Sequence, residues 1–273
     1  MRSYSLEGIP ENSSVKVLLV DDDQDSYLLT RRMLNKIDGA FQIDWASSFE
    51  SGLESVARHA HDVYLFDYRL GAHNGLELLR QALAIGCKKP IIMLTTENPE
   101  VDAEAMRLGA ADFLNKERLD ASLLERSIRY SIKQFSTLRA LRESQAQLGS
   151  FMQNVPCALY MKDLQGRYVY VNGVCEKLFN RPPLECTGKN DDELWHKSAA
   201  QKQRETDRKV ATTRKAIETT ETIAKADGLH YWLATRFPIL NEQGATMMIG
   251  GAAIDITERK RLEREIQEIS ERE

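Results

Sequence analysis

Short apolar runs alternate with longer amphipathic stretches from about residue 16 to residue 116. The amphipathic stretches, such as residues 26–37 and 76–85, have the length and polarity of helices that cover a sheet. The apolar runs have the length of buried strands and occur at residues 17–20, 41–45, 63–66, 91–94 and 112–114. This alternation predicts an α/β domain over residues 15–130, with a doubly wound five-stranded parallel sheet and right-handed crossovers.

A different pattern follows between residues 120 and 151, which contain no proline and a single glycine, Gly149. Apolar residues recur there mostly at intervals of three and four, at Leu124, Ile128, Ile132, Phe135, Leu138, Leu141 and Leu148. The spacing predicts one long helix of about 45 Å. Its length favours a connector, with residues 131–152 as a helical linker that pairs two copies in a coiled-coil dimer. The alternative is a helix whose first half packs on its own domain and whose second half is loose.

A second domain is expected over residues 153–257. It contains four strand-like runs, two near its start and two near its end, at residues 158–161, 168–171, 231–240 and 246–254. Residues 241–244 join the last two runs as a hairpin loop that contains glycine. The segment between the two pairs, residues 195–226, is expected to be helical and charged. The order of strands, helices and strands predicts an α+β domain with an antiparallel sheet.

The chain ends in a charged helical stretch, residues 258–273. Its apolar residues Leu262, Ile266 and Ile269 are spaced four and three apart, as in a heptad seam. This seam is too short to be stable alone. We therefore expect residues 258–273 to begin a signalling helix that continues in a longer protein.

Composition narrows the function classes. The 273 residues are 42% hydrophobic and 29% charged with a net charge of −4, which gives no global basis for nucleic-acid binding. No apolar run approaches the roughly 18 residues of a membrane span, and the polar residues 1–14 do not form a signal peptide. The four cysteines form no CxxC pair, which indicates reduced thiols in a cytoplasmic protein.

Polar residues follow four of the predicted strands. Asp21 and Asp22 come after the first, and Asp67, Thr95 and Lys116 end or follow the third, fourth and fifth. In a doubly wound sheet these strand ends converge on one edge, where ligands bind. Several carboxylates there need a cation, and hard oxygen ligands suit Mg²⁺. Together with a hydroxyl and an amine, they predict a phosphoryl-transfer site.

The same residues carry a family resemblance. The segments KVLLVDDD at 16–23, DVYLFD at 62–67, LT at 94–95 and NK at 115–116 resemble the receiver domain of bacterial response regulators over residues 15–130. The resemblance implies that Asp67 is phosphorylated from a phosphohistidine donor, which is a histidine kinase or a phosphotransfer protein. It also implies that Mg²⁺ is held by Asp21, Asp22, Asp67 and the backbone carbonyl of Arg69.

Three further roles follow from the resemblance. Thr95 and Lys116 would contact the phosphoryl group, and Phe113 would be the rotating aromatic residue of the switch. The sequence departs from the family where Glu117 replaces the usual proline after the lysine. Arg69 and Glu97 occupy positions that influence dephosphorylation in the family, so we expect Arg69 to change how water reaches the phosphate.

The second domain resembles a PAS domain. Residues 155–172 (VPCALYMKDLQGRYVYVN) resemble its opening and residues 254–260 (IDITERK) its exit. Cys186 lies in Glu-Cys-Thr-Gly rather than in the Asn-Cys-Arg-Phe-like stretch of photoactive flavin domains. His196 is the only helical candidate for a haem ligand, and a surface or capping role is favoured for it. We therefore expect no PAS cofactor, or an unknown small ligand.

Three outputs remain open. Residues 262–273 resemble the segment that leads into the phosphoacceptor helix of one histidine-kinase family, and we therefore expect the chain to be the regulatory part of a sensor histidine kinase. The alternatives are a receiver–PAS adaptor that works by dimerisation, and the regulatory front of a cyclic-dinucleotide enzyme. No kinase or cyclase catalytic domain is present in these residues, and no helix-turn-helix pattern indicates DNA binding.

Overall fold

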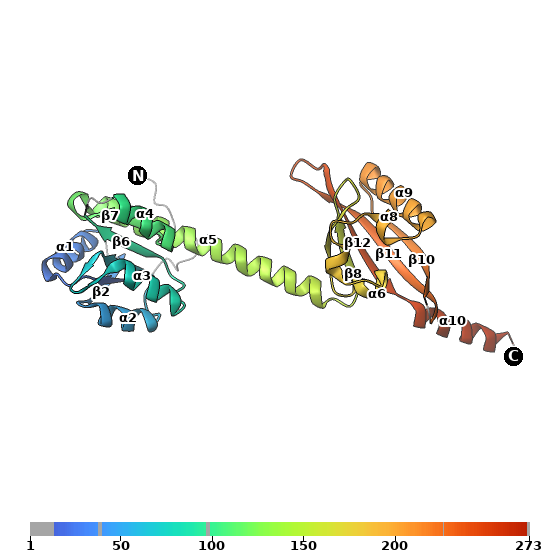
Figure 1. The fold of residues 1–273 in the computed structure, drawn as a ribbon, viewed down its shortest axis with the longest axis horizontal. Helices are drawn as coiled ribbons and strands as arrows, with labels where there is room; N and C mark the ends of the chain where they lie inside the picture. Colours follow the sequence, from blue (N-terminus) through green and yellow to red (C-terminus); the bar gives the residue numbers. More distant parts are fainter. Residues whose placement is uncertain (1–13, 38–39, 97–98, 226, 272–273) are drawn as a thin grey trace. The chain divides into compact units, whose positions relative to one another are not determined.

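The computed structural model describes residues 14–37, 40–96, 99–225 and 227–271, and Glu97 and residues 1–13 lie outside this range. The chain divides into two compact units, which meet in sequence between Ser144 and Gln145. Figure 1 shows their helices and strands, and many of them are labelled. Among the described helices, none is long and apolar enough to cross a membrane.

A five-stranded parallel sheet forms the centre of the first unit, with the order β2-β1-β3-β6-β7. Its strands are β1 (Val15–Val20), β2 (Phe41–Ala46), β3 (Val63–Asp67), β6 (Ile91–Thr95) and β7 (Asp112–Asn115). The helices between them are α1 (Gln24–Asn35), α2 (Phe49–Ala57), α3 (Gly75–Ala84) and α4 (Pro99–Leu108). The doubly wound parallel sheet expected from the sequence is therefore confirmed.

Two cores cover the two faces of this sheet. Alternate residues of β1 point to opposite faces because a strand has a period of two. Leu18 and Val20 belong to the core formed with α2, α3 and α4, whereas Val17 and Leu19 belong to the core formed with α1 and α5. Both faces are thus buried, as a parallel sheet requires.

Smaller elements complete the edge at the carboxyl ends of the strands. β4 (Arg69–Leu70) and β5 (His73–Asn74) form a short antiparallel hairpin after β3. A 3₁₀ turn, η1 (Lys116–Arg118), follows β7. Both elements lie next to the polar strand ends, and they shape the site described below.

Helix α5 runs without interruption from Ala121 to Asn154. Its first turns are buried against the sheet of the first unit, at Leu124, Ser127, Ile128 and Ser131. Further along, Leu138, Leu141, Leu148 and Phe151 are each between 46% and 66% exposed. The long helix expected from the sequence is present, and its apolar stripe is covered only over its first part.

The second unit contains an antiparallel sheet with the order β10-β11-β12-β8-β9. Its strands are β8 (Ala158–Lys162), β9 (Tyr168–Val171), β10 (Ile217–Lys225), β11 (Gly228–Leu240) and β12 (Thr246–Asp255). The helices are α6 (Cys175–Phe179), α7 (Pro183–Cys186), α8 (Asp191–Leu194), α9 (Lys197–Thr213) and α10 (Thr257–Ser270). The antiparallel α+β domain is confirmed.

The expectation of a helical segment over residues 195–226 is wrong in its second half. Helix α9 ends at Thr213, and β10 then pairs antiparallel with β11. Side chains along β10 alternate between half-buried and exposed, and several of them are threonine or isoleucine. The alternation and the β-branched residues favour a strand. The charged residues among them obscure this two-residue period in the sequence.

Ionised side chains lie inside the second unit. The Lys162 side chain is 1% exposed, and its Nζ lies 2.7 Å from Asp191 Oδ1 and 2.8 Å from Asp207 Oδ2. Arg236 is equally buried and lies 2.6 Å from Glu221 Oε1. Tyr168 donates a hydrogen bond to Asp191. Buried charges of this kind are tolerated because each meets a charge of opposite sign.

Candidate functional site

The backbone at the end of β1 is held in place by the neighbouring strand. The Asp21 N–H donates to the carbonyl of Ala46, at 3.1 Å. The Asp21 carbonyl accepts a hydrogen bond of 2.8 Å from Trp45 Nε1. These bonds fix the Asp21 backbone at the carboxyl edge of the sheet, beside Asp67, the last residue of β3.

Three carboxylates gather at this edge. One oxygen of each of Asp21, Asp22 and Asp67 lies within 4.8 Å of the others. Asp21 and Asp67 are buried, whereas Asp22 is exposed. Ser26 donates a hydrogen bond of 2.6 Å to Asp21, and the N–H of Gly71 donates one of 2.9 Å to Asp22. The structure thus brings together the acidic residues predicted from the sequence.

Lys116 connects two of the carboxylates. Its Nζ lies 2.8 Å from Asp21 Oδ2 and 2.7 Å from Asp67 Oδ1. Burial lowers the pKa of Lys116, but the hydrogen bonds to Asp21 and Asp67 outweigh that effect and raise the pKa above its ordinary value. Lys116 is therefore a cation that can offset negative charge at this edge.

Asp67 behaves differently from an exposed aspartate. Burial raises the pKa of the Asp67 carboxyl group above its ordinary value, although the hydrogen bond and charge of Lys116 oppose the shift. The nearby charge of Asp21 raises it further. Attack by this carboxyl group requires its ionised form, which the contact with Lys116 favours.

A cavity of about 250 Å³ opens beside these residues. Its lining consists of Asp22, Asp23, Asp67, Tyr68, Arg69, Thr96 and Lys116. Arg69 lies in the short strand β4 and is exposed. The predicted metal ligand Arg69 and the predicted phosphoacceptor Asp67 therefore share this cavity.

Three predicted residues lie outside the cavity lining. Asp21 contacts Lys116, which is part of the lining. Thr95 ends β6 and is buried, and its Oγ1 donates a hydrogen bond of 2.9 Å to Asp102 on α4. Its neighbour Thr96 lines the cavity instead. Phe113 lies on β7 and is 40% exposed. In this arrangement the hydroxyl of Thr95 is engaged with a helix.

Several residues of the site carried no recognisable sequence signal. Gly75 starts α3, and a Cβ atom there would lie 2.2 Å from the carbonyl oxygen of Asp67. Its N–H donates to the carbonyl of Tyr68. A glycine at a helix start is common, so only the close approach to Asp67 reveals why the residue must be small. Ser26 and Trp45 also support Asp21, through a hydrogen bond to its side chain and one to its carbonyl, respectively.

The donor set fits a hard divalent cation. Three carboxylates converge, and the exposed Asp22 and the adjoining cavity leave room for water and phosphate oxygens. Mg²⁺ prefers this combination of few carboxylates and several waters. The residues that would hold it are Asp21, Asp22 and Asp67, with the carbonyl of Arg69.

His196 and Cys186 are the two residues of the second unit that the sequence singled out as candidate cofactor ligands. His196 precedes α9 as its N-cap residue, and its side chain makes no capping hydrogen bond. Cys186 is buried at the end of α7, and burial raises the pKa of its thiol.

Comparison with known families identifies both units. Residues 17–128 match the response regulator receiver domain, and residues 152–261 match the PAS fold. Together the two matches account for most of the chain, in the order expected from the sequence.

Among curated proteins, the chain is 30% identical over 152 residues to a protein-glutamate methylesterase/protein-glutamine glutaminase of Oleidesulfovibrio alaskensis. That match covers 53% of this chain and 41% of the relative. The transcriptional regulatory protein MalR of Bacillus subtilis is 32% identical over 145 residues, which are 51% of this chain and 60% of MalR. The match thus spans about half the length of these relatives.

Among solved structures, a CheY-like response regulator receiver domain protein from Methanospirillum hungatei is similar at 23% identity. The similarity covers 46% of this chain and 98% of that one, with a TM-score of 0.42. A PAS domain from Colwellia psychrerythraea is similar at 18% identity over 42% of this chain and 98% of that one, with a TM-score of 0.37.

Proposed function

We propose that Asp67 accepts a phosphoryl group from a phosphohistidine. The chain joins a receiver domain to a PAS domain, and this combination belongs to phosphorelay signalling. The observation that carries the proposal is the position of Lys116, whose amine joins Asp67 to Asp21 beside the cavity. Such a constellation serves phosphoryl transfer because the amine and the carboxylates lie where charge develops.

The chemistry is a displacement at phosphorus. An oxygen of Asp67 attacks the phosphorus, the P–N bond to the donor imidazole breaks, and the electron pair leaves on the imidazole nitrogen. Lys116 moves its contact from the Asp67 carboxylate to a phosphoryl oxygen. A Mg²⁺ ion held by Asp21, Asp22 and Asp67 would supply positive charge that offsets the charge of the phosphoryl group. The product is an acyl phosphate on Asp67.

The new charge then alters contacts at the edge of the sheet. Phosphorylation adds roughly −1.5 to −2 of charge. The hydroxyl of Thr95 would turn from Asp102 to the phosphoryl group, which breaks its hydrogen bond to α4. Phe113 on β7 would rotate with it and shift the start of α5. This is the switch by which the receiver domain would act on the following helix.

We propose domain limits of 15–130 for the receiver domain, 131–152 for a helical linker, 153–257 for the PAS domain and 258–273 for the start of a signalling helix. The exposed apolar residues Leu138, Leu141 and Leu148 support a homodimer through the helices, because two such stripes can cover each other. The output that we favour is a histidine kinase.

Incubation with acetyl phosphate and Mg²⁺ tests the phosphoacceptor. We expect intact mass spectrometry to show one added phosphoryl group on the wild-type chain and none on Asp67→Asn. Asp192→Asn is a matched control, since this exposed carboxylate of the second unit lies outside the site. Phosphorylation of Asp67→Asn to the wild-type extent would overturn the assignment.

The transmission step has its own test. One or two residues inserted after Ser144 rotate the helix that follows, because each residue turns an α-helix by about 100°. In the full-length protein, we expect the insertions to abolish the effect of phosphorylation on the output while leaving phosphorylation of Asp67 intact. Unchanged coupling in both insertion variants would contradict transmission through α5.

A further inference from the structure

A second cavity lies at the opposite edge of the receiver domain, where the strands begin. Its volume is about 810 Å³, which is within the range of sites for small organic ligands. One wall is helix α5, and the other is formed by the ends of α3 and α4 and the loops that lead into β6 and β7. Phosphoryl transfer does not use this cavity, which we call the α5 groove.

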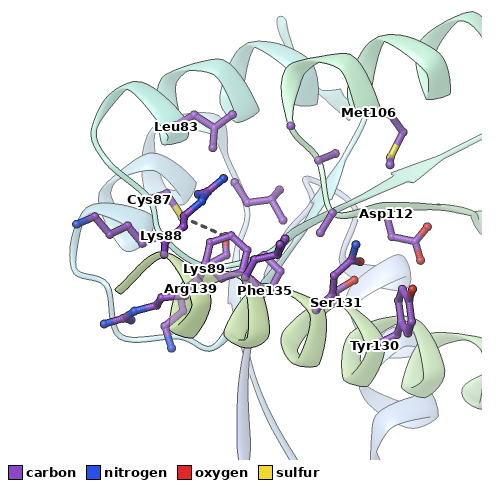
Figure 2. Close-up of a pocket in the computed structure, with 18 of the residues that line it drawn as sticks. Leu83, Cys87, Lys88, Lys89, Met106, Asp112, Tyr130, Ser131, Phe135 and Arg139 are labelled. Carbon is purple, nitrogen blue, oxygen red and sulfur yellow. Dashed lines mark hydrogen bonds between the residues drawn. The ribbon is translucent and has the colours of Figure 1, made fainter. Parts of the chain in front are cut away.

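Apolar side chains cover much of the groove. Figure 2 shows Leu83 of α3 and Met106 of α4 pointing toward α5, which contributes Tyr130 and Phe135. Leu83, Met106 and Tyr130 are between 37% and 65% exposed. Side chains of this size leave an apolar surface that a ligand with an apolar body can cover.

An unsatisfied hydroxyl lies in the same groove. Ser131 is only 1% exposed, and its Oγ has no hydrogen-bond partner among the described residues. Figure 2 shows Ser131 on the face of α5 that lines the cavity. A buried hydroxyl without a partner is costly, so a polar atom of a ligand at this position would gain a hydrogen bond.

The charges of the groove favour an anion. Lys89 pairs with Asp62, and Arg139 pairs with Glu143. The other two cations of the lining, Lys88 and Arg142, are exposed and have no ion pair within the described part of the chain. The second acidic residue of the lining, Asp112, accepts hydrogen bonds from Ser127 and from the Phe113 N–H.

We propose that the α5 groove binds a small amphipathic anion, with its apolar body between Met106 and Phe135 and its anionic group near Lys88 and Arg142. The apolar walls, the unsatisfied Ser131 hydroxyl and the two unpaired cations each fit one part of such a molecule. Because α5 forms one wall, the occupant would hold this helix against the start of β7.

Anilinonaphthalene sulfonate is a suitable fluorescent probe, since it has an aromatic body and one sulfonate. We expect the full chain to bind it at one site that decanoate empties and that decanol, of equal chain length, does not. The double variant Lys88→Glu/Arg142→Glu should weaken probe binding about tenfold or more, because it removes two charge-assisted contacts. Lys133→Glu is the matched control, since Lys133 is an exposed residue of α5 outside the lining.

Ser131→Leu places a larger side chain in the α5 wall of the groove without a change of charge, and it should weaken probe binding as well. Since the double variant changes only exposed residues, the test does not depend on the folding of Ser131→Leu. Wild-type probe binding by the double variant would overturn the proposal, and so would equal displacement by decanol. Sedimentation shows whether the chain self-associates. If probe binding is lost as the chain self-associates, the groove is an interface between copies and the proposal is overturned.

Discussion

The amine of Lys116 lies 2.7 Å from Oδ1 of Asp67, although the two residues belong to different strand ends. The same amine contacts Asp21, which is 95 positions away in the sequence. Lys116 therefore offsets part of the negative charge of the carboxylates at this site. An incoming phosphoryl group has to replace Asp67 as a partner of the Lys116 amine. The first two predictions follow from that exchange.

Replacement of Lys116 by alanine should slow phosphorylation. Without the amine, the developing charge on the phosphoryl oxygens loses one preorganised donor, a loss that costs about 10²-fold in rate at comparable sites. The rate is measured by intact mass after addition of acetyl phosphate and Mg²⁺. Lys133→Ala, on the exposed side of α5, is expected to react like the wild type. Equal rates for the Lys116→Ala and wild-type chains would contradict the role of Lys116.

The phosphorylation rate should fall at low pH. Only the ionised Asp67 carboxylate attacks phosphorus, and burial raises its pKa, so the carboxyl group keeps its proton to a higher pH than an exposed aspartate does. The rate is therefore full above the raised pKa and is lost as the pH falls through it.

The Lys116→Ala variant gives the control for this profile. Lys116 opposes the upward shift of the Asp67 pKa, so its removal should move the acid limb to higher pH. Both chains are measured with the same donor between about pH 4 and pH 8, which cancels the titration of the donor itself. Coincident acid limbs would exclude Asp67 as the titrating group.

Gly75→Ala should destabilise the receiver domain. The new Cβ would lie 2.2 Å from the backbone oxygen of Asp67, so the backbone has to move. Overpacking of this kind costs about 2–3 kcal/mol. Gly149→Ala is the control, because nothing lies within 4 Å of its Cβ position and a helix gains up to about 1 kcal/mol from the change. Urea unfolding measures both, and a neutral Gly75→Ala would contradict the close approach.

Arg69→Asn should shorten the lifetime of the phosphorylated protein severalfold. Arg69 lines the cavity beside Asp67, and we expect its long side chain to restrict the approach of water. The lifetime is followed as loss of the phosphoryl group after the donor is removed. Arg58→Asn, on the exposed surface outside the cavity, is the matched control. Comparable lifetimes in the wild type and Arg69→Asn would refute the role of Arg69.

Lys162→Met should destabilise the PAS domain. The change leaves the buried Asp191 carboxylate without its cation, and loss of one partner of a buried pair costs about 3–5 kcal/mol. Arg259→Ala removes an exposed pair with Glu263 and should cost less than about 0.5 kcal/mol. The two variants are compared by thermal and urea unfolding. If Lys162→Met were as stable as the wild type, another group would have to compensate the buried charge of Asp191.

The alternation of apolar and polar residues was enough to predict both sheets and the long helix, because that pattern reports which face of each element is buried. It also located Asp21, Asp67 and Lys116, since parallel strands end at a common edge. The pattern failed at β10, whose charged residues obscure its two-residue period.

What remained was decided by contacts between residues far apart in the chain. The sequence could not reveal that Lys116 bonds to two carboxylates, that Thr95 faces Asp102, or that Gly75 touches the Asp67 backbone. Local periodicity carries no information on these distances, which depend on how helices and loops pack on the sheet. The chemical groups of the site were thus set by the sequence alone, whereas their pairing, burial and pKa shifts arise only in the tertiary structure.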